Sequence, residues 1–224
     1  GWLRAVGPGW ISWGVESFLD EIADQIGQDP VAMRMGLLDG AGKNAGGKGS
    51  TVGGAKRLAA VLKDVSERAG WGREMPASEG LGVAVGHGQE RGMPTWIACV
   101  AHVVVDPSSG NVTLKKLWQT IDVGTVVNPD GAMAQAEGAA LWGVSLALHE
   151  GAQFANGEVL EQNLDRYTPL RMGDVPELDI VFVDSDEFPS GMGEPPLIPV
   201  APAVGNAIFA ATGKRVRDLP IRLS

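Results

Sequence analysis

The chain of 224 residues contains 32 glycines and 14 prolines, which excludes coiled coils and helical bundles because both residues are avoided inside long helices. A hydrophobic content of 44%, with seven tryptophans and 20% charged residues, excludes an intrinsically disordered chain. The 27 acidic residues outnumber the 18 basic ones, and the net charge of −9 makes nucleic acid a poor partner because phosphate contacts need clustered Lys and Arg.

The first part of the chain predicts a loop followed by helices. Residues 1–10 are rich in Gly and Pro and indicate a loop. Residues 13–26 have the 3.6-residue period of an amphipathic helix, with apolar side chains at Val15, Phe18, Leu19, Ile22, Ala23 and Ile26. Asp29 and Pro30 are a typical N-cap and first-turn pair for a second helix that runs to Leu38. A third helix is predicted over residues 55–69.

A Gly-rich stretch separates the second helix from the third. Residues 39–54 contain seven glycines in sixteen positions, a composition typical of a flexible linker. We therefore expect a helical segment with its linker over residues 1–50 and a larger domain over residues 51–224.

From residue 80 onward the hydrophobic period changes to two. Strands are predicted over residues 81–88, 95–105, 111–122, 153–160 and 178–183, with hairpin turns at residues 106–110 and at Asn156-Gly157. Helices are predicted over residues 129–149 and 203–211, and Gly213 is the expected C-terminal cap of the second one. The predicted fold class is α+β: N-terminal helices followed by a mixed sheet with two embedded helices.

The loop over residues 189–202 is the most informative segment for chemistry. Glu194 lies between two glycines and the pair Pro195-Pro196. Glycine allows the backbone to approach a ligand closely, and proline holds a loop rigid. A carboxylate on such a loop is either a general base or an ordinary surface side chain. The residues alone leave both interpretations open.

Other candidate residues have simpler interpretations. Arg4, in a Gly-rich apolar segment, either binds an anion or pairs with a neighbouring carboxylate. His87 and His102 lie in predicted strands, where a hydrogen-bonded structural histidine is expected. Cys99 is the only cysteine, so it cannot form an internal disulfide, and it is interpreted as a small buried hydrophobe. The histidines show no metal-ligand spacing, and we expect no metal held by protein side chains.

The chain carries neither an initiator methionine nor a signal peptide at Gly1, and no apolar run long enough to span a membrane is apparent. We interpret this start as that of a trimmed chain or of part of a longer polypeptide. The sequence does not distinguish between a cytoplasmic and a periplasmic location.

Five groups of residues occur in the order found in the C-terminal part of one enzyme family. They are Leu3-Arg4-Ala5-Val6-Gly7 with Glu16-Ser17-Phe18 and Asp20-Glu21; Asp122-Val123-Gly124 with Val127-Asn128-Pro129; Gln135-Ala136-Glu137-Gly138; Leu170-Arg171-Met172 with Pro176-Glu177; and Gly193-Glu194-Pro195-Pro196 with the segment from Asn206 to Gly213. Through them the chain resembles the large subunits of molybdenum hydroxylases, the xanthine oxidase family. It is most similar to the branch that contains the beta chain of isoquinoline 1-oxidoreductase and the molybdopterin-binding subunit of membrane-associated aldehyde dehydrogenase.

The resemblance implies an oxidoreductase that hydroxylates an aldehyde or an N-heterocycle with water-derived oxygen. Its molybdenum would be held by a molybdopterin dithiolene, expected in the cytosine dinucleotide form, and Glu194 would be the general base. Leu3, Arg4, Ala5 and Gly193 match positions that contact the cofactor, and Val6 matches a position facing the substrate pocket. Xanthine oxidase itself has an aromatic residue at the position of Val6, which makes xanthine a poor substrate candidate.

The family's Gly-Gln-Gly cofactor loop is absent from these residues. We therefore expect the remaining part of the molybdopterin subunit to complete the site, as an upstream segment or a separate chain. The resemblance also implies an iron–sulfur small subunit carrying [2Fe–2S] clusters, and this chain alone is expected to be inactive. The alternative is a non-catalytic, stand-alone domain of the same fold that acts as a binding or assembly module.

Overall fold

The computed structural model describes residues 3–38, 54–90 and 93–223. A four-stranded sheet forms its centre, in the order β1 (Glu79–Glu90), β2 (Met93–Val105), β3 (Val112–Asp122) and β6 (Glu177–Phe182). The first three strands are antiparallel neighbours, whereas β6 pairs in parallel with β3. The sheet is therefore mixed, and the predicted α+β class is confirmed.

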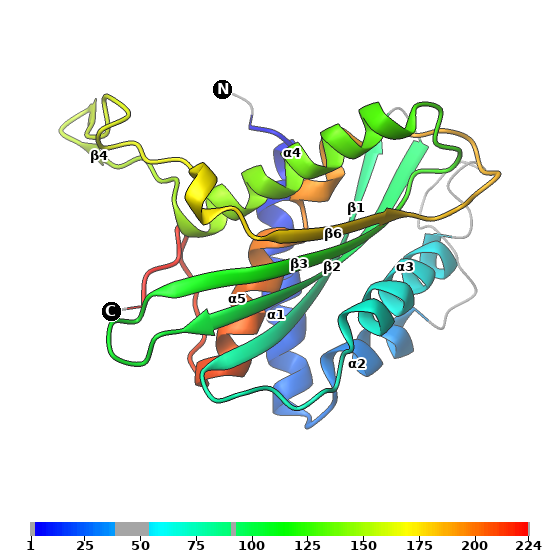
Figure 1. The fold of residues 1–224 in the computed structure, drawn as a ribbon, viewed down its shortest axis with the longest axis horizontal. Coiled ribbons are helices and arrows are strands. Elements are labelled where there is room, and N and C mark those ends of the chain that lie inside the picture. Colours follow the sequence, from blue (N-terminus) through cyan, green and yellow to red (C-terminus); the bar gives the residue numbers. More distant parts are fainter. Residues whose placement is uncertain (1–2, 39–53, 91–92, 224) are drawn as a thin grey trace.

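Helices cover both faces of this sheet (Figure 1). On one face, α5 (Val200–Thr212) packs on β1 and β2, and α1 (Val6–Gln25) packs behind α5. On the other face, α3 (Gly54–Ala69) packs on β2 and β3 and contacts α2 (Pro30–Leu37). The long α4 (Pro129–Leu148) runs beside β6 and contacts α5. The sheet thus separates two hydrophobic clusters, one beneath α5 and α4 and one beneath α3.

Glycines on β1 allow α5 to approach the sheet closely. A Cβ atom at Gly82 would overlap the backbone of Ala203 and Ala207 on α5, and one at Gly80 would overlap the backbone at Ala207. The helix could not lie this near the strand if either glycine carried a side chain. The glycine content of β1 is therefore a packing requirement.

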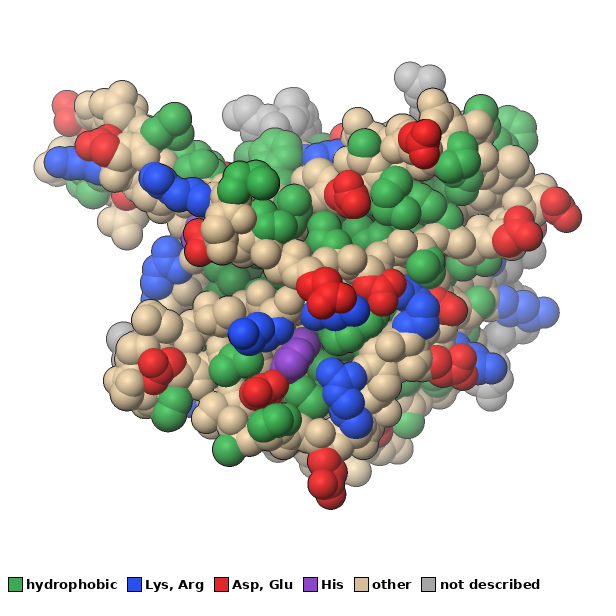
Figure 2. Space-filling model, in the orientation of Figure 1, with side chains coloured by type: hydrophobic (Ala, Val, Ile, Leu, Met, Phe, Trp, Pro, Cys, Tyr) green, Lys and Arg blue, Asp and Glu red, His purple; other side chains and the backbone are tan. Residues whose placement is uncertain are grey.

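Charged side chains of both signs alternate across the face shown in Figure 2. Arg68 of α3 pairs with Asp179 of β6 at 2.5 Å and with Asp64 at 3.0 Å, and Lys116 of β3 pairs with Glu177 at 2.5 Å. Such partly exposed pairs each contribute at most about 1 kcal/mol. They set the position of α3 on the sheet and of the edge strand β6 within it, and contribute little to stability.

Most local predictions are confirmed. The Asp29 carboxylate accepts hydrogen bonds from the backbone N–H groups of Val31 and Ala32 at 2.9 and 2.8 Å, so it caps α2 as expected. Asn128 caps α4 in the same way, with Pro129 in the first turn. Gly213 closes α5 with a φ of 71°, in the left-handed region.

Most predicted ends differ from the structure by one or two residues, and three segments differ more. The loop expected over residues 1–10 is helical from Val6 onward, because Pro8 lies in the first turn, where its missing N–H is not needed. The same reason places the start of α5 at Val200 and not at residue 203, with Pro202 in its first turn. The strand expected over 153–160 is a short hairpin of β4 (Phe154–Ala155) and β5 (Glu158–Val159) around the predicted Asn156-Gly157 turn.

The Gly-rich linker predicted over 39–54 and the domain boundary after residue 50 lie outside the described residues, apart from Gly54, which begins α3. One described segment, Pro195–Thr212, is long and apolar enough to cross a membrane by length and composition alone. It is 78% buried inside the protein. This segment therefore packs as a core helix.

The orientation of α1 is opposite to what its amphipathic pattern indicates. Ala23 is fully buried, but Val15, Phe18 and Ile26 are 49%, 62% and 56% exposed. The side of the helix that faces the fold instead carries Ser12, Glu16, Asp20 and Ala23. The apolar stripe of α1 thus points away from the core of the described chain.

Candidate functional site

Three segments far apart in the sequence meet at Arg4. Its Nε donates a hydrogen bond to the carbonyl oxygen of Gly193. Its Nη2 donates to the side-chain oxygen of Gln135 at 2.8 Å and to the backbone oxygen of the same residue at 3.2 Å. The guanidinium also lies 6.0 Å from the ring centroid of Trp142. The start of α1, the middle of α4 and the Gly-Glu-Pro loop are therefore joined through one side chain.

The backbone that presents Arg4 is in an unusual conformation. Ala5 and Val6 have φ values of 68° and 40°, in the left-handed region that favours glycine. For a β-branched residue such as Val6 this conformation is strained. Ala5 is only 3% exposed and packs against a small cluster formed by Ala139, Leu197 and Ile198. This packing holds the turn before α1 in place.

Side chains of the central sheet hold the loop that carries Glu194. Pro195 and Pro196 are buried and begin the one-turn helix η3 (Pro195–Leu197), with Glu194 at its N-cap. The side-chain amide of Gln119, on β3, donates to the carbonyl oxygen of Pro196 at 2.7 Å. On β2, the hydroxyl of Thr95 donates to the carbonyl oxygen of Gly191 at 2.5 Å. Contacts from two strands thus hold the loop in place. The Glu194 side chain that the loop carries is half-buried.

Charge links Arg4 to Glu194. Burial lowers the pKa of Arg4 below its ordinary value, and the negative charge of Glu194 opposes this shift. The two side chains are therefore within electrostatic reach of each other. The arrangement offers one cation, one carboxylate and one neutral amide, from Arg4, Glu194 and Gln135.

The other predicted site residues lie around this point. Leu3 is 46% exposed and Val6 is half-buried, whereas the side chain of Ala5 points into the core. Gly193 faces Gln135, whose side-chain oxygen would lie 3.1 Å from a Cβ atom placed on that glycine. The absence of a side chain at Gly193 therefore leaves room for the contacts that Arg4 makes.

The histidines and the cysteine belong to other surroundings. His102 pairs with Glu79 at 2.6 Å, as expected of a structural histidine in a strand. His87 is exposed and stacks on Trp96, with ring centroids 5.7 Å apart. Cys99 is fully buried, and burial raises the pKa of its thiol, which confirms its interpretation as a small hydrophobe.

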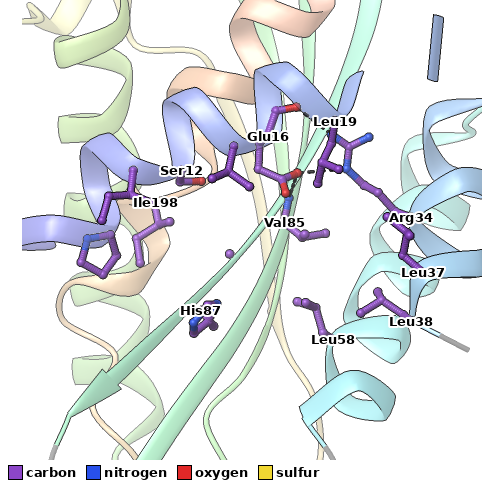
Figure 3. Close-up of a pocket in the computed structure, with 14 residues that line it drawn as sticks. Ser12, Glu16, Leu19, Arg34, Leu37, Leu38, Leu58, Val85, His87 and Ile198 are labelled. Atoms are coloured by element: carbon purple, nitrogen blue, oxygen red, sulfur yellow. Dashed lines mark hydrogen bonds and ion pairs between the residues drawn. The ribbon is translucent and has the colours of Figure 1, made fainter. Parts of the chain in front are cut away.

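A separate cavity of about 440 Å³ lies between α1, α2, α3 and β1 (Figure 3). Ile198 lines one end of it, and Arg34 and Leu37 line the other. Its walls are mainly aliphatic. The cavity touches neither Arg4 nor Glu194, so it is distinct from the site described above.

Three residues that build the site have no functional signal in the sequence. Gln135 lies in one of the motifs shared with the family, but nothing in the sequence indicates that its side chain is the main side-chain acceptor for Arg4. Thr95 and Gln119 lie inside strands and have no local signal, because their importance depends on the loop that folds over them. Within residues 3–38, 54–90 and 93–223 no three His, Cys, Asp or Glu side chains are grouped closely enough to bind a metal.

Comparison with known proteins gives consistent matches. The family described as "Molybdopterin cofactor-binding domain" matches residues 48–176. The chain is 53% identical, over 99% of its length, to a membrane-bound aldehyde dehydrogenase [pyrroloquinoline-quinone] of Gluconacetobacter polyoxogenes and covers 29% of that protein. It is 32% identical, again over 99% of its length, to the beta chain of isoquinoline 1-oxidoreductase of Brevundimonas diminuta and covers 26% of that protein. The chain thus spans less than a third of these relatives.

Solved structures agree on the fold. The crystal structure of the aldehyde oxidoreductase from Desulfovibrio desulfuricans matches with a TM-score of 0.75 at 15% identity, over 96% of this chain and 40% of that one. Quinoline 2-oxidoreductase from Pseudomonas putida 86 matches with a TM-score of 0.51 at 24% identity, over 54% of this chain and 16% of that one. At these identities the matches show the architecture alone.

Proposed function

Because the chain belongs to the molybdopterin cofactor-binding domain family, we propose that it forms one wall of the active site of a molybdenum hydroxylase, with Glu194 as the general base. The substrate class is an aldehyde or an N-heterocycle. The names of the two relatives above, an aldehyde dehydrogenase and an isoquinoline oxidoreductase, support this choice. Their similarity also confirms the family resemblance seen in the sequence motifs.

The observation that carries the proposal is the convergence of Arg4, Gln135 and the Gly193-Glu194 loop. The donors fit an anionic, flat group such as a pterin with its phosphate. The Nη1 atom of Arg4 makes no hydrogen bond to any described residue, and it lies 3.5 Å from where a Cβ atom on Gly138 would stand. A half-buried guanidinium beside two glycines can approach a phosphate or a carbonyl edge closely.

Each predicted contact residue has a role that suits its place. Arg4 would bind an anionic part of the cofactor, and Gly193 would allow the backbone to approach it. Leu3, which is exposed, would contact the cofactor through its side chain, whereas the buried Ala5 can contribute only its backbone. Val6 would face the substrate. When bound, the molybdenum cofactor would supply the two-electron redox chemistry and the water-derived oxygen of the hydroxylation.

Glu194 would accept the proton that the water-derived hydroxyl loses during hydroxylation of the substrate. Its loop is rigid because two prolines are buried and Gln119 and Thr95 hold the loop backbone. A base held in one position loses little entropy on reaching the reactive geometry. The positive charge of Arg4 lies within electrostatic reach of the Glu194 side chain.

Two finer parts of the proposal concern the cofactor and the partners. The cytosine dinucleotide form of molybdopterin is proposed from the sequence resemblance. An iron–sulfur small subunit is proposed from the same resemblance, and the single cysteine of this chain cannot supply the four ligands of a [2Fe–2S] cluster. The isoquinoline 1-oxidoreductase relative and a nicotinate dehydrogenase relative from Pseudomonas putida are both named as single subunits of their enzymes, which supports a multi-chain assembly.

The alternative is a binding or assembly module of the same fold without catalysis. Glu194→Gln in the complete enzyme distinguishes the two. We expect kcat to fall by about 10² to 10⁴, the usual contribution of a positioned base, with about one molybdenum per complex retained. Glu137→Gln is the matched control, because Glu137 is an exposed glutamate on α4 two positions from Gln135. Normal turnover of the Glu194→Gln enzyme with cofactor bound would reject the base, and an assembly without molybdenum would favour the binding module.

A further inference from the structure

The Asp122-Val123-Gly124 motif lies at the edge of the sheet from which the chain runs on to Glu194. β3 ends at Asp122, and its parallel neighbour β6 ends at Phe182, at the same edge. We define the approach segment as residues 183–190, which follow β6 and lead to the Gly-rich stretch before Glu194. Because the two strands end together, this segment passes the end of β3 on its way to Glu194 (Figure 1).

Hydrogen bonds tie the approach segment to the residues that follow β3. The backbone N–H of Thr125 donates to the carbonyl oxygen of Glu187 at 2.9 Å, and the Thr125 hydroxyl donates to the same oxygen at 3.1 Å. The carbonyl oxygen of Val123 accepts from both the backbone N–H and the hydroxyl of Ser190, at 2.9 and 3.1 Å. The approach segment is therefore held at two points by the residues on either side of Gly124.

Gly124 allows this close approach. Its φ is 69°, in the left-handed region that favours glycine. A Cβ atom at this position would overlap the carbonyl oxygens of Glu187 and Phe188 in the approach segment. The conformation of this turn also depends on Asp122, whose Oδ1 accepts a hydrogen bond from the backbone N–H of Gly124 at 3.0 Å. The Gly124 turn is thus fitted to the approach segment on one side and to Asp122 on the other.

The Asp122 carboxylate is in turn held by Arg57, near the start of α3. Nε of Arg57 donates to Oδ2 at 2.7 Å and Nη2 donates to Oδ1 at 2.5 Å, a two-pronged pair that fixes the rotation of the carboxylate. Only 6% of the Asp122 side chain is exposed. The hydrogen bond to Asp122 raises the pKa of Arg57 above its ordinary value, and the charge of Glu187 adds to this shift. Because Oδ1 accepts from both Arg57 and Gly124, the ion pair and the turn share one atom.

We propose that Asp122 is a positioning residue for the hydroxylation, which fixes the Gly124 turn and, through the approach segment, the place of Glu194. Both oxygens of its carboxylate are occupied by Arg57 and Gly124, so it acts through these contacts and not as a second base. A general base must lie within hydrogen-bond reach of the proton that it accepts. A displacement of about 1 Å can lower the rate by about 10². The inference rests on the base role proposed for Glu194.

A second arginine of α3 provides a matched control. Arg68 pairs with Asp179 of β6 at 2.5 Å, the same residue types at the same distance as Arg57 and Asp122. Arg68 also donates to the carbonyl oxygen of Gln119 at 2.7 Å. Its hydrogen-bond partners within the described chain lie on α3, β3 and β6. A general loss of stability would therefore affect an Arg68 variant at least as strongly as an Arg57 variant.

The first measurement is amide hydrogen exchange of the complete enzyme, followed by mass spectrometry. In Arg57→Lys the Asp122 carboxylate loses its two-pronged partner, and we expect peptides that contain Thr125 or Ser190 to exchange about tenfold faster. Asp122→Ala should raise the exchange rate of these peptides further. Arg68→Lys should leave both peptides unchanged. Equal exchange in the Arg57→Lys and Arg68→Lys enzymes would overturn the proposal.

The second measurement is steady-state kinetics per bound molybdenum. Asp122→Ala is expected to lower kcat by about 10- to 100-fold and to change KM by less than about twofold, because a displaced base slows proton transfer without weakening substrate binding. Asp122→Asn retains an oxygen that can accept from Gly124 and Arg57, and it should restore most of kcat. Asp179→Ala is the control and should keep the wild-type kcat. An unchanged kcat in Asp122→Ala, or an equal loss in Asp179→Ala, would contradict the proposal.

The two measurements separate this inference from the role proposed for Glu194. Normal turnover of the Glu194→Gln enzyme would reject the base, whatever the exchange rates of the approach segment are. Equal exchange in the two arginine variants would reject the positioning role of Asp122, even if the Glu194→Gln enzyme is inactive.

Discussion

Arg4 and Gln135 are 131 positions apart, yet the guanidinium of the first donates a 2.8 Å hydrogen bond to the side-chain oxygen of the second. The same guanidinium also holds the carbonyl oxygen of Gly193. One side chain therefore sets the relative position of α1, α4 and the loop that presents Glu194. The candidate site depends on this three-way contact more than on any single segment.

Removing the Gln135 side chain tests that contact. In Gln135→Ala, Arg4 keeps its bonds to two carbonyl oxygens but loses its only side-chain acceptor among the described residues. A hydrogen bond to a charged group contributes about 1.5–3 kcal/mol, and less at an exposed position. We expect the affinity for the molybdenum cofactor to fall about tenfold, which corresponds to about 1.4 kcal/mol, with little change in Tm. The molybdenum content after dialysis measures this loss. Gln135→Glu keeps the acceptor and should retain the metal; full occupancy in Gln135→Ala would contradict the role of this contact.

The buried pair Glu16–Arg34 gives a prediction about stability. Both side chains are nearly inaccessible, at 6% and 2% exposure. Glu16→Ala leaves the Arg34 charge buried and unpaired, which costs about 3–5 kcal/mol. Denaturant unfolding of the purified subunit measures this loss. Glu21→Ala is the matched control on the same helix, because its pair with the more exposed Arg217 should contribute at most about 1 kcal/mol.

Close packing of α5 on β1 predicts opposite results for two glycines. Gly82→Ala would place a methyl group against the backbone of Ala203 and Ala207, so α5 must move and stability should fall by about 1–3 kcal/mol or more. Gly36→Ala on α2 meets no atom within 4 Å and should stabilise the helix by about 0.5–1 kcal/mol. Thermal unfolding compares the two variants. Equal effects of the two substitutions would show that the packing of α5 on β1 does not depend on the glycine at position 82.

Tyr167 gives a prediction about pH. Its hydroxyl donates a hydrogen bond to the carboxylate of Glu150, which, with burial and the charge of Glu150, raises the pKa of the phenol to about 12. Because the folded pKa lies above the ordinary value of 10, this contribution to stability is complete below pH 10 and is lost as pH rises toward 12.

The difference in absorbance at 295 nm between wild type and Tyr167→Phe isolates this titration, since Tyr167 is the only tyrosine of the chain. We expect a midpoint near 12 in the native protein. Glu150→Gln should lower the midpoint toward the ordinary pKa of a tyrosine. A midpoint near 10 in the wild type would mean that the bond to Glu150 does not form.

Local sequence signals predicted those elements whose causes are local. Asp29 before Pro30 specified the start of α2, and Asn156-Gly157 specified a hairpin turn, because caps and turns depend on residues a few positions away. The glycines and prolines around Glu194 are a local signal of the same kind. Neither Thr95 nor Gln119 could be found in this way, because their contacts span 96 and 77 positions.

By itself the sequence determined the α+β class, the helix caps, the hairpin turns and the family to which the chain belongs. Only the tertiary structure decided which face of α1 is buried. The apolar period of that helix predicts an apolar inner face, but Arg34, Val85 and Arg215 bind Glu16 and Asp20 and turn the polar face inward. Periodicity shows which residues share a face of a helix. Which face is turned toward the core depends on partners supplied by distant parts of the chain.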